Sequence, residues 1–153
     1  MVGFTTIAWA WAEHALEHMI WNIDGSVTEM RGHKQIPVSL GNKLDYMKKA
    51  LADVPSLKAL EPDGRTLVER FVSMKERRGD IVHGAMFRAA EAGAFQSLTF
   101  DTKGRAQTLV KAPVTIPEMV LFNKEVLSLA NDATAFLWRV TDAVGERWPV
   151  TRG

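Results

Sequence analysis

The chain has 153 residues, enough for one domain with a real hydrophobic core, because a globular body of this size buries about 70% of its unfolded surface. Its 46% hydrophobic and 24% charged residues are typical of ordinary soluble proteins and exclude a disordered chain. A net charge of +1 excludes a global field that would recruit nucleic acid or a membrane, and the absence of cysteine excludes disulfides, thiolate metal sites and cysteine nucleophiles.

The first residues predict neither a membrane span nor a signal peptide. The apolar stretch from Ile7 to Ala12 is far shorter than the roughly 20 residues that a span needs. No basic residue precedes this stretch, and Glu13 follows it directly. We therefore expect a cytoplasmic protein, a single domain over residues 1–153, with no membrane association.

The segment from Phe4 to Ile23 predicts a first helix with two apolar sides. One stripe has core spacing: Trp9, Ala12, Leu16, Met19, Ile20 and Ile23. The opposite side lacks the Lys and Glu residues of a solvated face and carries Ile7, Trp11, His14, His18 and Trp21. We expect both sides to be buried, the second against another chain, with Trp11, His14, His18 and Trp21 as dimer-interface residues.

Residues 24–37 are rich in turn formers and predict a loop. Ser39 is placed to cap a second helix that runs to about Val54, with an inner face of Leu40, Leu44, Met47 and Leu51. Pro55, Pro62 and Gly64 punctuate the segment that follows. A third long helix is expected from about Arg65, with Leu67, Phe71 and Met74 on one face.

After Gly93 the apolar period becomes that of strands. "AFQSLTF" and "AQTLVKA" flank the turn-forming "DTKG", so residues 94–112 predict a β-hairpin. Thr115 and Glu118 form a capping-box pattern around Pro117, which predicts a last helix to about Val144. The side expected to pack consists of Val120, Leu127, Ala130 or Asn131, Thr134, Leu137 and Trp138. The fold class is therefore mainly all-α, a bundle of four to five helices with a small β-hairpin before the last helix.

The segment "ERRGDIVHG", residues 76 to 84, places unusual polar residues on the third helix. Arg78 falls within about 20° of Phe71, the centre of the apolar stripe. A buried guanidinium costs several kcal/mol, so Arg78 must snorkel, pair with a carboxylate, or line a cleft or interface. His83 is five residues further on, about 140° around an undistorted helix. Either the helix bends at Gly79, or the two residues converge with groups from elsewhere, such as a second copy.

The residues from Arg78 to Gly84 resemble the R-x-x-x-x-H signature of the HEPN superfamily, small all-helical nucleotide-binding and ribonuclease proteins. The order of elements is also similar to that of uncharacterised bacterial members: the helix "IAWAWAEHALEHMI", the segment "IPVSLGNKLDYMKKAL", the signature, a hairpin and a final helix. Gly79 departs from the pattern, because the family commonly has Asn, Asp or His there.

The resemblance implies a metal-independent endoribonuclease without a cofactor, in which Arg and His of two subunits promote attack of the RNA 2′-hydroxyl. His83 has the proton affinity for acid–base work near neutral pH. Arg78 offers a planar fork of donors for the phosphate oxygens. Asp80 is expected to orient one of them. The resemblance thus favours an enzyme, with Arg78, His83 and Asp80 as catalytic residues in a homodimer.

Other interpretations of the same residues stay open. Arg78 could pair with Asp80, Glu76 or another carboxylate, and His83 could be a hydrogen-bonded structural histidine. The chain could then be a non-catalytic helical dimer that binds RNA or a protein partner, which Gly79 favours. It could also be the toxin of a pair, its activity masked by an antitoxin.

The remaining polar clusters give weaker indications. Arg77, on another face, is expected to be solvated. With Lys48, Lys49, Lys103 and Arg105 it is a candidate RNA-phosphate contact; the same residues, together with Lys43, Lys58 and Lys111, could be plain solvated surface. His14 and His18 have the i, i+4 spacing of helix-borne metal ligands, but no third ligand is evident, so packing is favoured and no metal is expected.

Overall fold

The computed structural model describes residues 2–26, 37–83, 85–88, 93–100, 108–110 and 114–145. Within these ranges four helices form the body: α1 (Val2–Ser26), α2 (Leu40–Asp53), α3 (Glu61–His83) and α4 (Ile116–Val144). A short 3-10 helix spans Pro55–Leu60. Strands β1 (Ala85–Arg88), β2 (Ala94–Phe100), β3 (Thr108–Val110) and β4 (Val114–Thr115) lie between α3 and α4 in sequence. The predicted fold class, a helical bundle with a hairpin before the last helix, is confirmed.

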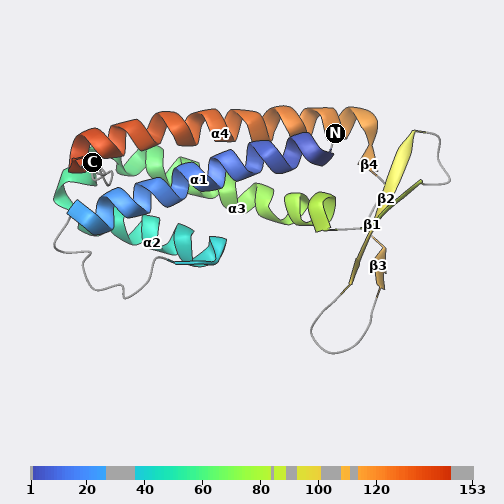
Figure 1. The fold of residues 1–153 in the computed structure, drawn as a ribbon, viewed down its shortest axis with the longest axis horizontal. Helices are drawn as coiled ribbons and strands as arrows, with labels where there is room; N and C mark the ends of the chain where they lie inside the picture. The colour runs from blue at the N-terminus through green and yellow to red at the C-terminus, as the bar shows by residue number, and fades with distance from the viewer. Residues whose placement is uncertain are drawn as a thin grey trace, which may run out of the picture.

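Helices α1 and α4 lie side by side and run in the same direction (Figure 1). The Asn22 side chain donates a hydrogen bond to Thr141 at 2.9 Å, and the Thr5 hydroxyl donates one to the side chain of Asn123. These two bonds lie near opposite ends of α1, so the two helices stay in register over their length. Helix α3 runs the opposite way, since Asp63 meets Arg139 and Arg70 meets Asp132. The sheet lies beyond the end of α3 and the start of α4 (Figure 1).

The hydrophobic core fills the space between the four helices. The predicted stripe of α1 is buried, as are Leu44, Met47 and Leu51 of α2 and Leu67, Phe71 and Met74 of α3, while Leu40 of α2 is partly buried at the edge of the core. Trp9 and Phe71 meet edge to face with ring centroids 5.8 Å apart, which ties α1 to α3. The inner faces predicted for these three helices are therefore confirmed.

Two predicted helix starts are confirmed at the level of individual hydrogen bonds. The Ser39 hydroxyl accepts from the backbone of Asn42 at 3.2 Å and caps α2. Thr115 and Glu118 form the complete capping box at the start of α4, with Pro117 in its first turn.

The start of α3 differs from the prediction. The helix begins at Glu61, not near Arg65, because Pro62 sits in the first turn, where its missing N–H is no loss. Gly64 is also helical and lies against Leu51 and Phe136, where a side chain would collide. Both residues are therefore part of the helix and do not interrupt it.

The sheet is larger than the predicted hairpin. Strands β2 and β3 pair antiparallel, with Leu98 opposite Val110, which confirms the hairpin itself. Strand β1, which the sequence analysis did not anticipate, pairs with β2 on its other side, and β4 pairs with the first residues of β2. The predicted tip, "DTKG", lies outside the described residues.

The outer sides of α1 and α4 differ most from the prediction. Within the single chain, Ile7, Trp11 and Trp21 of α1 are exposed, so the expected second buried side is not buried here. Of the side predicted to pack on α4, Ala130 is buried and Leu137 packs against the core, whereas Val120, Thr134 and Trp138 are exposed. The other buried residues of α4 are Met119, Phe122, Asn123, Val126, Leu129, Ala133, Phe136, Val140 and Thr141. The prediction for α4 was therefore right only for Ala130 and Leu137, because the helix carries two apolar stripes and only one of them faces the core.

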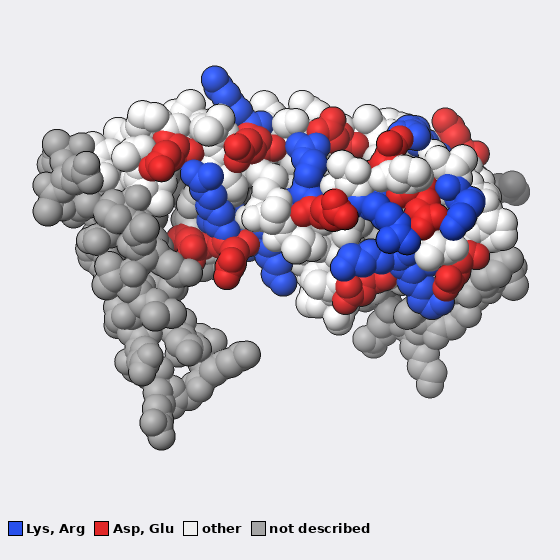
Figure 2. Space-filling view, turned by 180° about the vertical axis from the view of Figure 1, so that it is seen from behind, with Lys and Arg blue, Asp and Glu red and all other residues white. Residues whose placement is uncertain are grey.

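Charged side chains of both signs alternate over the side of the bundle seen from behind (Figure 2). No large area of one sign is visible on that face, in keeping with the net charge of +1. Across the described part of the chain, none of the helices combines the length and apolar character needed to cross a membrane.

Candidate functional site

Arg78 lies near the end of α3 with its guanidinium over the Trp9 ring of α1, 5.7 Å from the ring centroid. Arg78 is half-buried, as the sequence predicts for an arginine on the apolar stripe of its helix. A cation over an indole face is stabilised by roughly 0.5–2 kcal/mol, more as water is excluded. The indole surface thus supplies part of the attraction that stabilises the half-buried guanidinium.

Trp9 itself is held in place by Glu13 and Phe71. Its indole Nε1 donates to Glu13 Oε2 at 3.3 Å, one helical turn further along α1, and the ring is 1% exposed. Phe71 packs against the same ring. The surface beneath Arg78 is therefore fixed by one hydrogen bond and one aromatic contact.

Lys43 of α2 is linked to the same group of side chains through Glu13. Its Nζ donates to Glu13 at 2.9 Å and to Glu17 at 2.5 Å, and its side chain is only 5% exposed. We call Trp9, Glu13, Glu17, Lys43 and Arg78 the Lys43 network. It links α1, α2 and α3, and each Lys43 carboxylate partner sits on the helix that also carries Trp9.

The protonation of Lys43 is determined by two opposing effects. Burial acts to lower its pKa, but the hydrogen bonds that Lys43 donates to Glu17 and Glu13, and the negative charges of these two residues, outweigh burial, so the net pKa is raised. The ammonium form is therefore the form that the fold stabilises. Lys43 was predicted as solvated surface, and the structure shows instead a buried cation clamped by two carboxylates.

The motif residues cluster at the end of α3. His83 is the last residue of this helix, and Gly79 and Asp80 are half-buried in its final turns. The helix continues through Gly79 without interruption, so the bend considered at that glycine does not break α3. The structure thus places the backbones of Arg78, Asp80 and His83 in the last two turns of one helix, at the end from which the sheet departs (Figure 1).

Arg77 is half-buried, not solvated as predicted. One of its guanidinium nitrogens donates to the backbone oxygen of Glu118 at 3.2 Å, and the group lies 4.8 Å from the centroid of the Phe122 ring. The end of α3 thus carries one arginine against α4 and one against α1. Arg77 joins α3 to the start of α4.

The predicted RNA-contacting lysines lie away from this cluster. Lys48 pairs with Asp45 at 3.3 Å and Lys49 with Asp53, both along the surface of α2. Exposed pairs of this kind contribute about 0–1 kcal/mol and reduce the positive charge offered to a phosphate. Lys103 and Arg105 lie outside the described residues.

The rings of His14 and His18 lie against each other on the outer side of α1, with centroids 4.3 Å apart and planes tilted by 54°. Burial and the neighbouring His14 lower the pKa of His18, while Glu17 acts in the opposite direction. No group of three or more side chains of metal-ligating type gathers in the described part of the chain. Within that part, the pair has no third residue that could complete a metal site.

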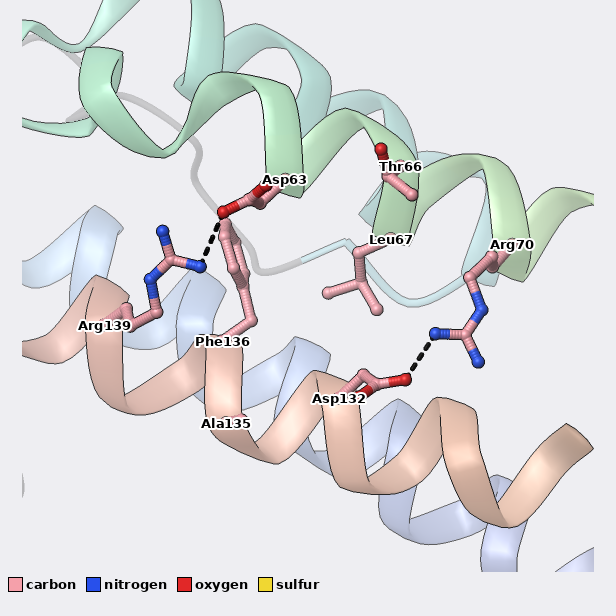
Figure 3. A pocket seen from close by; sticks show the side chains of 8 residues that line it. All are labelled: Asp63, Thr66, Leu67, Arg70, Asp132, Ala135, Phe136 and Arg139. Carbon is pink, nitrogen blue, oxygen red and sulfur yellow. Dashed lines mark hydrogen bonds and ion pairs between the residues drawn. The ribbon is translucent and has the colours of Figure 1, made fainter. Parts of the chain in front are cut away.

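A groove of about 270 Å³ between α3 and α4 is a separate feature (Figure 3). Two ion pairs cross it, Arg139 with Asp63 at 2.8 Å and Arg70 with Asp132. Leu67 and Phe136 form its floor. Because both arginines already form ion pairs with carboxylates, we interpret the groove as part of the contact between the two helices and not as an anion-binding site.

The structure separates the predicted interface residues from the predicted catalytic ones. Trp9, beneath Arg78, faces the core, whereas Trp11 is two residues later and therefore about 200° around α1, on the outside. The Lys43 network was not found from sequence, because its members come from three helices. The one local signal was the Trp9–Glu13 spacing of one helical turn.

No protein-family model, curated protein or solved structure matches this chain. The likeness to the HEPN superfamily therefore rests on the residues of the motif and on the order of the elements.

Proposed function

We propose that this protein is a metal-independent endoribonuclease that acts as a dimer, with Arg78 and His83 of both chains in a composite site. The observation that carries the proposal is the fixed position of Arg78, half-buried on Trp9 in the helix that ends at His83. A cation held in place before substrate arrives needs no reorganisation to stabilise charge that develops in the transition state.

The reaction is an internal transfer on the RNA backbone. One His83 removes the proton of a 2′-hydroxyl, whose oxygen forms a bond to the adjacent phosphorus. The bond from phosphorus to the 5′-oxygen breaks, and His83 of the second copy gives its proton to that leaving oxygen. The products are a 2′,3′-cyclic phosphate and a 5′-hydroxyl. Arg78 donates to the non-bridging phosphate oxygens throughout, and Asp80 positions one of the two.

The test is cleavage of structured and unstructured RNAs by purified protein in excess EDTA. We expect products with 5′-hydroxyl ends and a loss of about 100-fold or more in His83→Ala. Arg78→Lys is expected to lose activity as well, because an ammonium lacks the two-pronged fork. Arg65→Ala, which removes an exposed arginine paired with Glu61 on the same helix, is the matched control and keeps full activity. Activity that EDTA abolishes, or that His83→Ala retains, contradicts the proposal.

Mixing chains tests the composite site. A tenfold excess of His83→Ala, refolded together with wild type, leaves few wild-type chains paired with each other. A site that uses both histidines then loses about tenfold in activity per wild-type chain. A site contained in one chain loses nothing.

The second candidate is a non-catalytic helical dimer that binds RNA or a protein partner, including an antitoxin. Gly79 in the place of a polar residue and the uncovered apolar side of α1 favour it. In that case no RNA is cleaved, and Arg78→Ala changes stability alone.

A further inference from the structure

The outer side of α1 carries an apolar stripe with regular spacing. Phe4, Ile7, Trp11, His14, His18 and Trp21 follow one another by alternate steps of three and four, the repeat of a helix–helix seam. Phe4 is 48% exposed, Ile7 57%, Trp11 61% and Trp21 57%. None of the six is a lysine, arginine, aspartate or glutamate. Helix surfaces that face water normally carry such residues, so this stripe is built for contact.

A second apolar stripe lies beside it on α4. Helices α1 and α4 are parallel, and hydrogen bonds join Thr5 to Asn123 and Asn22 to Thr141. The residue just before each of these positions on α1 therefore turns to the same outer side as the residue just after each of them on α4. On α4 this side holds Val120, Leu127, Thr134 and Trp138, with Val120 41% and Trp138 60% exposed. These are residues whose pattern predicted a packed face. Together the two stripes form what we call the α1–α4 outer face.

The size of this face matches that of a dimer interface. Its three tryptophans alone expose on the order of 400 Å², taking about 250 Å² for a whole side chain. That is already as large as the biggest apolar patch on a typical monomer, about 300–600 Å². With the flanking residues, two copies placed face to face bury on the order of 1,200 Å², the lower limit for a stable specific pair.

Charge at the edge of the face selects a second copy in one orientation. Lys124 and Asp142 are exposed on α4, near opposite ends of its outer stripe, and neither is in the ion pairs that α4 forms within the described part of the chain. Lys124 lies at the edge of the face toward α3, where it also lines a groove with Arg70 and Ser73. A two-fold axis across the middle of α4 would bring Lys124 of one chain to Asp142 of the other. A nucleic acid or an anionic membrane would call for several basic residues, and this face has Lys124 alone.

We propose that two copies of this chain associate through the α1–α4 outer face with their helices antiparallel. The face points away from α3, since Trp11 and Trp9 lie on opposite sides of α1. The two copies of α3 then flank the paired α1–α4 layers on the outside, about 30 Å apart at roughly 10 Å per layer. This pairing is therefore independent of the composite site, which requires contact at the end of α3.

Sedimentation equilibrium of the full chain tests the pairing. At about 10 µM, wild type is expected at an even multiple of the 17.0 kDa chain mass, two chains or, where the composite site also forms, four, and Trp11→Lys with Trp138→Lys at half the wild-type mass. Val72→Lys, which places the same charge at a 52% exposed position of α3, is the matched control and keeps the wild-type mass. All three positions are exposed in the single chain, so circular dichroism should show an unchanged helical fold.

A charge exchange tests the orientation. Lys124→Glu and Asp142→Lys are each expected to weaken the pair by about three- to tenfold, and the double variant to restore it. A monomeric wild type, a mass that the two tryptophan changes leave at the wild-type value, or a double variant no better than the singles overturns the proposal. A monomer that co-sediments with phosphatidylcholine vesicles also overturns it and assigns the face to lipid. Ribonuclease activity is measured separately, so failure of the pairing is distinguishable from failure of the proposed cleavage.

Discussion

Lys43 joins α2 to α1 through two ion pairs, with Glu13 and Glu17. A lysine that is 5% exposed would be strongly unfavourable without its two carboxylates, and the two carboxylates would repel each other without the lysine. The cluster is therefore stable as a unit and unstable when any part is removed. It also holds the edge of Trp9 through Glu13, and through Trp9 it reaches Arg78.

Lys43→Met is expected to lower the free energy of unfolding by about 2 kcal/mol at pH 7, since Glu13 and Glu17 are left facing each other but can gain some water. Urea denaturation measures this loss. Lys49→Met, which removes an exposed pair with Asp53, is the control and should change the same quantity by less than about 1 kcal/mol. Equal effects of the two variants would contradict a structural role for the Lys43 network.

The stability of wild type should also fall at alkaline pH. The pKa of Lys43 is raised in the folded chain, so its contribution is complete below the unfolded value of 10.5 and is lost as pH rises above it. Burial and the neighbouring Asp24 raise the pKa of Tyr46, which acts in the same direction above its unfolded value of 10.0. Thermal melts from pH 8 to 11 should show the decline begin near pH 10, less steeply in Lys43→Met.

His18 has the opposite dependence. Its pKa is lowered by burial and by His14, so the neutral form is preferred in the folded chain. Its contribution is complete above pH 6.5 and is lost as pH falls from 6.5 toward the lowered folded pKa. His18→Gln should reduce the decrease in melting temperature between pH 7 and 5 relative to wild type. An unchanged slope would mean that His18 titrates normally.

At the scale of the helices, the predictions from sequence were most accurate where the signal is local. The capping residue Ser39 and the Thr115–Glu118 box depend on residues within one turn, and each was located correctly. Gly64 was interpreted as a break, yet it is the residue that lets α3 approach Leu51. The role of a glycine inside a helix depends on its neighbour in space, which the sequence does not specify.

The two glycines of α3 give a matched pair of tests. Gly79→Ala should raise the free energy of unfolding by about 0.5–1 kcal/mol, because nothing lies within 4 Å of the new carbon and alanine favours the helix. Gly64→Ala should lower it by about 1–3 kcal/mol, since the new carbon would lie 2.6 Å from a Leu51 methyl. Denaturation of both variants checks the signs. A loss of stability in Gly79→Ala would contradict the open space found around this position.

At the scale of the whole molecule, the limit of sequence analysis is the partner of each apolar stripe. The core stripe of α1 and the outer stripe of α4 look equally apolar in sequence, but only the first is covered by the chain itself. Hydrophobic periodicity predicts that a stripe will be buried and does not say by which chain. For the same reason the sequence did not predict the pairing of Lys43 with two carboxylates of α1. These carboxylates, Glu13 and Glu17, precede Lys43 by 30 and 26 positions in the sequence.

The uncovered stripes have a consequence for thermal stability that requires no mutation. If the α1–α4 outer face joins two copies, unfolding separates them, and the melting temperature must rise with protein concentration. For two chains of 153 residues the rise is about 2 °C for each tenfold increase. The Trp11→Lys, Trp138→Lys chain should show a smaller rise across the same range, because its unfolding is no longer coupled to separation of this face. Calorimetry from about 5 to 500 µM separates the two behaviours, and a wild-type melting temperature independent of concentration would count against the pairing.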